Sequence, residues 1–359
     1  MRCKIYCEHW KDIRLSNIPL LDLRSEKEFY LGHIPRAVNL PLLNNQERHE
    51  IGTLYKHEGK SPAVSRGLEI FAEKADVFLQ KVETLAPDKK LILYCWRGGM
   101  RSRLVAYWLT LAGFQVEVIR GGYKSFRRDV LDGLDKLARH PKLVLNGRTG
   151  SGKSQFLEDM RARGCGVINL EQLAQHRGST FGGIAQKESS PSQQTFENLL
   201  YEAYLQVSSH PRLLLEIENF IGPVSVPQRV RESLRGSPMI FLSRNFEDRL
   251  DLIQKVYCEG WNRETEYEFI SNLVLLRKYL SRAEEEEIIL AVRRKDFSFA
   301  ISQLLQLRYD RVYDKSLKRH QQQAIAHFNL SEEEELARSY VQKILTENSE
   351  QLAKTNKEK

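Results

Sequence analysis

Apolar and polar positions follow two different periodicities, one typical of strands and one typical of helices, through the first third of the chain. Short apolar runs have strand character, and the segments between them repeat apolar residues at helical spacing. Strands that alternate with helices in this way predict a parallel α/β sheet. The expected strands are 18–23, 90–95 and 115–119, and the expected helices are 67–79 and 101–111. We place the first domain at 1–128.

The pattern changes twice further along. The segment 129–141 is charged, has helical period and ends at a proline, which predicts a linker helix. A second α/β unit is expected over 142–245, because strand-like runs recur there at 143–146, 212–216 and 238–242. From 246 to 359 the period is helical almost throughout, and the polar tail after Thr346 is expected to fray.

Composition narrows the class of protein. At roughly 150 residues per domain, a chain of 359 residues with 41% hydrophobic content should hold two or more domains. The 55 basic and 47 acidic side chains give a net charge of +8, which favours a polyanionic partner only weakly. No apolar run approaches the roughly 18 residues of a membrane span, and the start lacks the apolar core of a signal peptide. We therefore expect a cytoplasmic enzyme with no membrane association.

The five cysteines are scattered, so a disulfide framework is not expected and each thiol is judged by its surroundings. Cys95 stands where a buried strand ends and a helix begins, a position at which loop amides and the helix N-terminus favour an anion. Nearby arginines lower a thiol's pKa further, and the glycines let the backbone curl around the sulfur. The expected chalcogen loop is Trp96, Arg97, Gly98, Gly99, Met100 and Arg101. A buried structural cysteine is the alternative.

A second loop matches the pattern G-x-x-x-x-G-K-[ST], with a predicted strand before it and a helix after it. Backbone amides in such a loop converge on phosphate oxygens, the lysine adds a positive charge, and the final hydroxyl can meet a magnesium ion. The expected phosphate-binding residues are Gly147, Arg148, Thr149, Gly150, Ser151, Gly152, Lys153 and Ser154. Neither ATP hydrolysis nor diphosphate recognition is favoured by this motif.

Other polar residues are candidates for the same site. Glu216 and Glu218 alternate on a predicted strand and so share one face, where a carboxylate could hold magnesium or a metal-bound water. His176 and Arg177 precede a glycine-rich loop and could contact an anion. Solvated surface residues are the alternative for all four. The sequence leaves the role of Mg²⁺ open, and no other metal site is expected.

A basic helix is predicted near the C-terminal end. Its cations Arg308, Arg311, Lys315 and Lys318 recur at steps of three and four, which stacks them along one face, with two tyrosines on the neighbouring stripe. Cations beside aromatic rings suit RNA. Asp310 and Asp314 dilute the charge, so an ordinary salt-bridged helix remains equally consistent with the pattern.

The N-terminal motifs resemble a rhodanese domain. The resemblance rests on the segments 22–24 and 28–41 together with the Cys95 loop, and it covers about the first 125 residues. It implies that Cys95 carries a persulfide or a related chalcogen.

With the phosphate loop included, the chain from about 22 to 313 resembles the bacterial tRNA 2-selenouridine synthases. Additional segments carry this resemblance: 47–56, 121–127, 176–182, 191–198 and 216–222, although Ser154 and the Glu216 segment depart from the family's pattern. The resemblance implies a rhodanese-like domain, a P-loop NTPase-like α/β domain and a helical C-terminal region. It also implies S-geranylation of a wobble 2-thiouridine in tRNA from geranyl diphosphate, followed by replacement with selenium from selenophosphate, with no tightly bound cofactor. The alternative is an ATP-dependent tRNA sulfurtransferase or P-loop kinase.

Overall fold

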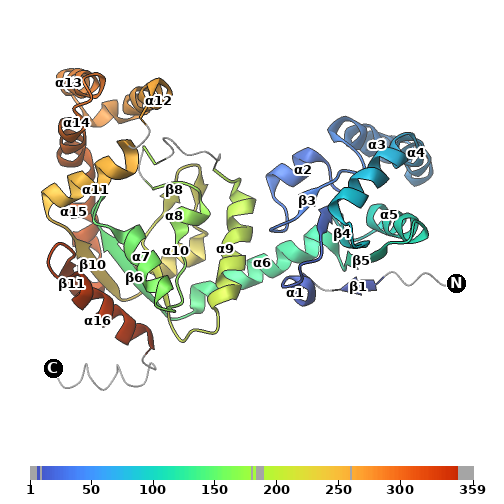
Figure 1. Ribbon diagram of the computed structural model, residues 1–359, viewed down its shortest axis with the longest axis horizontal. Helices are drawn as coiled ribbons and strands as arrows, with labels where there is room; N and C mark the ends of the chain where they lie inside the picture. The colour runs from blue at the N-terminus through green and yellow to red at the C-terminus, as the bar shows by residue number, and fades with distance from the viewer. Residues whose placement is uncertain (1–5, 9, 179–180, 183–189, 259–260, 347–359) are drawn as a thin grey trace. The chain divides into compact units, whose positions relative to one another are not determined.

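The computed structural model describes residues 6–8, 10–178, 181–182, 190–258 and 261–346. The chain divides into two compact units, shown in Figure 1. The N-terminal unit is 1–132 with 192–199, and the C-terminal unit is 133–191 with 200–359. The expected fraying of the tail after Thr346 lies outside the described residues.

The N-terminal unit is a parallel α/β sheet covered by helices. Its strands are β1 (Tyr6–Glu8), β2 (Leu20–Asp22), β3 (Val38–Asn39), β4 (Lys90–Tyr94) and β5 (Gln115–Ile119), in the order β1-β5-β4-β2-β3. Its helices are α1 (Trp10–Ile13), α2 (Glu26–Leu31), α3 (Asn45–His57), α4 (Lys60–Leu85) and α5 (Met100–Leu111). Two more helices, α6 (Gly122–Arg139) and α9 (Gln193–Val207), contribute residues to both units.

Local sequence explains the start of these helices. Ser25 and Glu28 form a capping box at the start of α2, and Asn44 and Glu47 form another at α3. The central strand β4 is buried from its second residue onward, as expected for a parallel strand covered on both faces. Because β4 itself is buried, the chain leaves the core at the carboxyl end of β4, and a reactive side chain can be placed there.

The C-terminal unit contains a second parallel sheet. Its strands are β6 (Lys142–Gly147), β7 (Leu213–Glu216), β10 (Met239–Ser243) and β11 (Ala324–Asn329), in the order β11-β10-β6-β7, and β8 (Phe220–Ile221) and β9 (Val224–Ser225) form a separate antiparallel pair. The helices near the sheet are α7 (Lys153–Ala162), α8 (Leu170–Leu173), α10 (Gln228–Arg235) and α16 (Glu334–Thr346). The others are α11 (Phe246–Cys258), α12 (Arg263–Leu273), α13 (Arg282–Arg293), α14 (Phe297–Leu304) and α15 (Asp310–Arg319). Short 3₁₀ segments occupy η1 (Val274–Tyr279) and η3 (Gln321–Gln323), and η2 (Leu305–Tyr309) is a π-helix.

The expected α/β units and the helical character of the C-terminal region are confirmed, with two additions. The strand β11 lies inside the region expected to be helical and pairs in parallel with β10, so this late segment completes the second sheet. The π-helix η2 interrupts the helical period just before α15. The helix expected over 129–141 is part of the longer α6, which begins at Gly122. Among the described helices, none is long and apolar enough to cross a membrane.

Candidate functional site

Cys95 lies directly after β4 and five residues before α5, as expected from the strand-to-helix pattern. Cys95 is 3% exposed, and its Sγ lies 3.3 Å from the Oγ of Ser102 on the first turn of α5. The Ser102 hydroxyl also lies 3.2 Å from the carbonyl oxygen of Gly99. The hydroxyl proton can therefore be directed to the sulfur when the sulfur is a thiolate, because a thiolate is the stronger acceptor.

The start of α6 holds the shape of the Cys95 loop. The amide of Tyr123 donates to the carbonyl oxygen of Cys95 at 3.0 Å, and the amide of Lys124 donates to that of Trp96 at 2.9 Å. Gly122 has a φ of 58°, and a Cβ built on it would lie 2.2 Å from the Cys95 carbonyl oxygen. Only glycine permits this close approach, so the first turn of α6 is part of the thiol site.

The remaining members of the expected chalcogen loop differ in exposure. Gly98 is buried and Gly99 is half-buried, whereas Arg97, Trp96 and Met100 are exposed. The guanidinium of Arg101 donates to the carboxylate of Glu28 at 3.3 Å, so its charge is already paired. Arg97 is thus the arginine of the loop that faces solvent.

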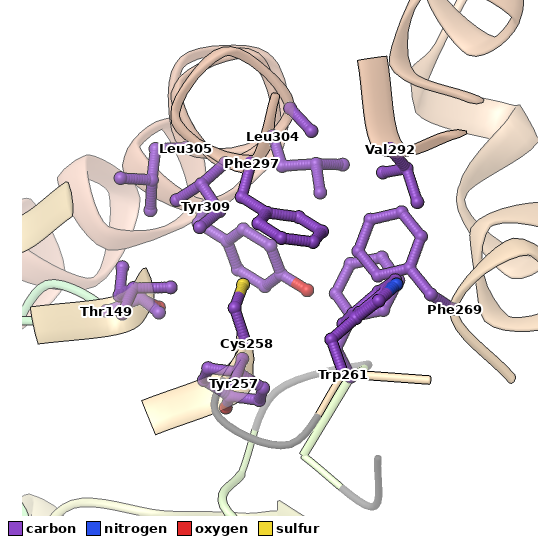
Figure 2. A pocket seen from close by; sticks show the side chains of 14 residues that line it. Thr149, Tyr257, Cys258, Trp261, Phe269, Val292, Phe297, Leu304, Leu305 and Tyr309 are labelled. Carbon is purple, nitrogen blue, oxygen red and sulfur yellow. The ribbon is translucent and has the colours of Figure 1, made fainter. Parts of the chain in front are cut away.

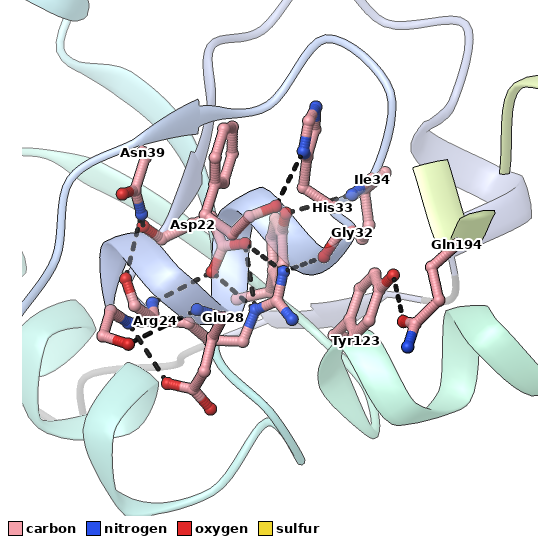
Figure 3. A network of polar contacts seen from close by, with 12 residues as sticks. Asp22, Arg24, Glu28, Gly32, His33, Ile34, Asn39, Tyr123 and Gln194 are labelled. Carbon is pink, nitrogen blue, oxygen red and sulfur yellow. Dashed lines mark hydrogen bonds and ion pairs between the residues drawn. The ribbon is translucent and has the colours of Figure 1, made fainter. Parts of the chain in front are cut away.

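A buried ion pair supports the loop from the neighbouring strand. Asp22 and Arg24 are 0% and 1% exposed and share several hydrogen bonds, and Arg24 also donates to the carbonyl oxygen of Gly32 at 2.7 Å (Figure 3). The Arg24 guanidinium lies 3.8 Å from the ring centre of Tyr123, whose hydroxyl is hydrogen-bonded to Gln194. Since removal of one partner would leave a buried charge, this network fixes the end of β2 against the start of α6.

The P-loop lies between β6 and α7 and has the shape that its motif predicts. Gly152 precedes the first residue of α7 in the left-handed conformation, with a φ of 90°. Lys153 Nζ donates to the carbonyl oxygen of Gly147 at 2.9 Å, which lays the side chain across the loop. The buried Nδ2 of Asn146 and Oγ of Ser151 have no hydrogen-bond partner within the described chain. Unsatisfied donors in such a loop fit an anion that is bound in function.

Three carboxylates gather beside the P-loop. Ligand oxygens of Glu171, Glu216 and Glu218 all lie within 4.8 Å of one another. Ser154 Oγ donates to Glu171 at 2.9 Å, and the amide of Glu171 donates to Glu216 Oε1 at 3.1 Å. The other carboxylate oxygen of Glu216, a residue that is 0% exposed, has no hydrogen-bond partner among the residues the structure describes.

Burial raises the pKa of each carboxyl group in this cluster, and repulsion from neighbouring carboxylates adds to the shift of Glu216 and Glu218. The pKa of Glu216 lies well above its usual value because the group is buried and faces the charges of Glu171 and Glu218. The same causes raise the pKa of Glu218 to about 8, and burial raises that of Glu171, although Lys153 opposes the shift. Carboxylate oxygens and a hydroxyl beside a P-loop lysine are the donor set that a hard divalent cation prefers, so these residues fit magnesium.

His176 and Arg177 lie close to this cluster. A Cβ on Gly182 or on Gly222 would meet the His176 ring, so the imidazole is packed between these two glycines. Burial lowers the pKa of His176, and its Nδ1 accepts a hydrogen bond from the amide of Gly178 at 3.2 Å. A neutral imidazole with a proton on Nε2 can therefore donate one hydrogen bond there. The positive charge of Arg177 lowers the pKa of Glu171, so Arg177 lies close enough to act on the acid cluster formed by Glu171, Glu216 and Glu218.

Two arginines connect the P-loop to α15. Arg249 is 2% exposed, donates to the carbonyl oxygen of Thr149 at 3.0 Å and holds both carboxylate oxygens of Asp310. Arg148 donates to Asp314 at 2.8 Å. The structure thus turns the Arg148 side chain toward α15, while the backbone of the P-loop remains available for phosphate.

These ion pairs also show which partners the two aspartates of the basic helix have. Asp310 and Asp314 face the P-loop, whereas Arg311, Lys315 and Lys318 are exposed and make no ion pair with any described residue. Arg308 belongs to the π-helix η2, and its guanidinium lies 4.0 Å from the ring centre of Tyr279. The expected single stripe of four cations is therefore three exposed cations on α15 and one half-buried arginine beside a tyrosine.

Sequence reasoning missed three residues that the structure brings to these sites. Glu171 stands on the four-residue helix α8 and reaches Ser154 across 17 positions, and Arg249 joins the P-loop from α11. No local motif marks either residue. Ser102 follows the expected chalcogen loop by one residue, and its position on the first turn of α5 was the available signal.

Comparison with known proteins agrees with the two-part organisation. A rhodanese-like domain profile matches residues 8–129, and the profile of the tRNA 2-selenouridine synthase AAA domain matches residues 140–347, more than half of the chain. A tRNA 2-selenouridine synthase of Marinobacter nauticus is 34% identical over 70% of this chain and 69% of its own length. That of Shewanella denitrificans is 34% identical over 86% of this chain and 90% of its own length, and that of Cupriavidus necator is 37% identical over 70% and 68%. This chain, a rhodanese-like domain followed by a P-loop domain, belongs to the tRNA 2-selenouridine synthase family.

Proposed function

We propose that this protein is a tRNA-modifying transferase that converts 2-thiouridine at the wobble position into 2-selenouridine in two steps. In the first step the sulfur is geranylated from geranyl diphosphate, and in the second the geranylthio group is replaced by selenium from selenophosphate. Membership of the family, whose curated relatives are named tRNA 2-selenouridine synthase, supports the modification of tRNA. The observation that carries the two-step scheme is that one chain holds both a thiol at a strand-to-helix turn and a P-loop.

The P-loop suits the first step. A bond forms between the thiocarbonyl sulfur and C1 of the geranyl group, the C1–O bond breaks, and diphosphate leaves with the electron pair. The negative charge that develops on the leaving diphosphate falls where loop amides and Lys153 can stabilise it. Glu171, Glu216, Glu218 and the Ser154 hydroxyl would hold a magnesium ion, which when bound supplies further positive charge to the diphosphate.

The Cys95 loop suits the second step. Alkylation makes the sulfur on C2 of the base a good leaving group. Selenium at the oxidation level of selenide, released from selenophosphate with phosphate as the other product, forms a bond to C2, the C2–S bond breaks, and geranyl thiol leaves with the electron pair. In this scheme Cys95 holds the selenium at that level until the transfer, with Ser102 as the hydrogen-bond donor to the sulfur. The near-complete burial of the thiol protects a reactive selenium species from solvent until the base arrives.

Reconstitution with the purified full chain tests this function. The protein is given tRNA that contains 2-thiouridine, with geranyl diphosphate and selenophosphate added singly or together, and nucleosides are analysed by mass spectrometry. We expect geranylthiouridine with geranyl diphosphate alone and selenouridine only when both are present. Calorimetry compares geranyl diphosphate with ATP. Tight binding of ATP together with no binding of geranyl diphosphate would replace this function with ATP-dependent thiolation.

A further inference from the structure

An apolar pocket lies in the helical part of the C-terminal unit. It lies between α11, α12, α13, α14 and η2, and its roughly 580 Å³ of empty space includes solvent at its open mouth. Figure 2 shows aromatic side chains on several sides of it, among them Trp261, Phe297 and Tyr309, with the sulfur of Cys258 directed inward. Almost every lining group is hydrocarbon, so the pocket suits an apolar ligand and not a nucleobase, which would need hydrogen-bond partners.

The pocket and the P-loop share a wall. Thr149 belongs to the P-loop and also lines the pocket. Ile253, another lining residue, packs on the P-loop so closely that a Cβ on Gly150 would lie 2.7 Å from its Cδ1. An anion on the loop amides would therefore stand directly beside an apolar space. A ligand that fits both must have a phosphate head and a hydrocarbon tail.

A cation stands at the same boundary. The Arg177 guanidinium lies 5.2 Å from the ring centre of Tyr257, which lines the pocket, and its charge acts on Glu171 in the acid cluster. Its Nη1 is buried with no hydrogen-bond partner in the described part of the chain. A buried donor without a partner costs free energy, and an oxygen of a bound diphosphate would satisfy it.

We propose that this pocket binds the ten-carbon chain of the prenyl diphosphate while the P-loop and Arg177 hold the diphosphate. This assignment rests on the proposed function and adds the binding site of the apolar half of the substrate.

Filling the pocket tests the assignment. Ala300 on α14 lines the pocket and is 1% exposed, whereas Phe299 on the same helix is 37% exposed and does not line it. We expect Ala300→Phe to weaken geranyl diphosphate binding at least about tenfold in calorimetry and to leave the binding of inorganic diphosphate within about twofold. Phe299→Leu, the matched control, should change neither. Unchanged geranyl diphosphate binding in a folded Ala300→Phe variant overturns the assignment.

Enlarging the pocket gives a second test that does not depend on tolerance of a larger core residue. Phe297→Ala should raise the use of farnesyl diphosphate relative to geranyl diphosphate at least about tenfold, because the longer chain gains space. An unchanged preference for chain length contradicts the assignment. Half-buried Cys258 gives a direct readout as well: geranyl diphosphate should slow its alkylation by N-ethylmaleimide about tenfold, and inorganic diphosphate should not. Equal protection by the two ligands also contradicts it.

Lys153→Ala separates failure of this assignment from failure of the proposed function. If inorganic diphosphate does not bind the wild-type protein, or binds Lys153→Ala equally well, the P-loop does not hold diphosphate and the proposed function fails. If Lys153→Ala loses both ligands while Ala300→Phe keeps both, the function stands and only the location of the prenyl chain is wrong.

Discussion

The loop after β4 and the loop after β6 have the same local design, a glycine-rich turn from a buried parallel strand into a helix. They differ in how completely their polar groups are satisfied. Around Cys95, Arg101 is paired with Glu28, Arg24 with Asp22, and the thiol with Ser102. Around Lys153, buried polar atoms of Asn146, Ser151, Arg177 and Glu216 have no partner among the residues the structure describes.

This difference fits a division of labour between the loops. A completed hydrogen-bond network holds one atom, the sulfur, in a fixed place, as a carrier of a single transferred atom requires. An incomplete set of donors and acidic groups is stabilised only when an anion and a cation bind. The Cys95 loop is therefore preorganised without a ligand, whereas the P-loop and its acids are completed by one.

The largest effect is expected from removing the thiol. Cys95→Ala should abolish selenium incorporation, because the carrier atom is lost, and should leave geranylation of thiouridine largely intact. Mass spectrometry of tRNA digests measures both products. Cys165→Ala removes another buried thiol and serves as the control. Loss of both products in the Cys95 variant would contradict the division of labour.

Lys153→Ala should act on the other product. Loss of the positive charge that faces the leaving diphosphate should slow geranylation about 10²- to 10³-fold, while the loading of selenium on Cys95 continues. The rate of geranylthiouridine formation under single-turnover conditions measures this effect. Gln155→Ala, on the exposed side of the same helix, is the control. Geranylation at the wild-type rate in Lys153→Ala would remove the P-loop from the reaction.

The acid cluster should make stability depend on pH. The pKa of Glu218 is raised from 4.5 to about 8, so in this window the folded chain binds a proton that the unfolded chain has lost. The free energy of unfolding therefore falls as pH rises from about 4.5 to about 8, by at most about 1.4 kcal/mol per pH unit for this group.

Glu218→Gln should remove this contribution, which urea denaturation at a series of pH values measures. Added Mg²⁺ should reduce the fall of the free energy of unfolding with rising pH in the wild-type protein, since it binds the ionised carboxylates. Removal of Mg²⁺ by EDTA should bring the full fall back. The same pH slope in the wild-type and Glu218→Gln chains would show that the carboxyl group keeps its ordinary pKa.

The smallest effect is expected on α15. Replacement of the exposed Arg311 and Lys315 by alanine should weaken tRNA binding modestly and reduce the slope of log affinity against log salt concentration by about 0.7 to 0.9 for each lost phosphate contact. Arg282→Ala removes another exposed arginine, one paired with Glu286, and is the control. An equal salt slope in the Arg311, Lys315 double variant would leave α15 with a structural role alone.

The sequence predicted features whose interacting residues are close together in the chain, and it missed features formed by residues that are far apart in the chain. The Cys95 loop and the P-loop are local motifs, so strand, loop and helix were all predictable from neighbouring residues. Glu171 was not, because only the packing of α8 brings it to Ser154. The strand β11 was missed because it is an edge strand whose residues are mostly exposed or half-buried, and because it follows a long run of helices. Its partner β10 lies more than 80 positions earlier.

The charge of the basic helix was predicted only in part for a related reason. Helical spacing put Arg308 in line with the cations of α15, but the π-helix η2 changes the period just before that helix. The spacing also could not assign Asp310 and Asp314 to partners on distant segments. Because Asp310 and Asp314 are paired with arginines at the P-loop, their charges do not argue against the binding of an anionic partner by the exposed cations of α15.

The close approach of Gly122 to the Cys95 carbonyl oxygen has a consequence for recognising this chemistry in other chains. Any side chain at this position would collide with the loop backbone, since even a first carbon atom would lie 2.2 Å from that oxygen. A chain could keep the cysteine and still be unable to fold the loop around it. The glycine that opens α6 is thus as informative a marker of an intact Cys95 loop as the cysteine 27 positions before it.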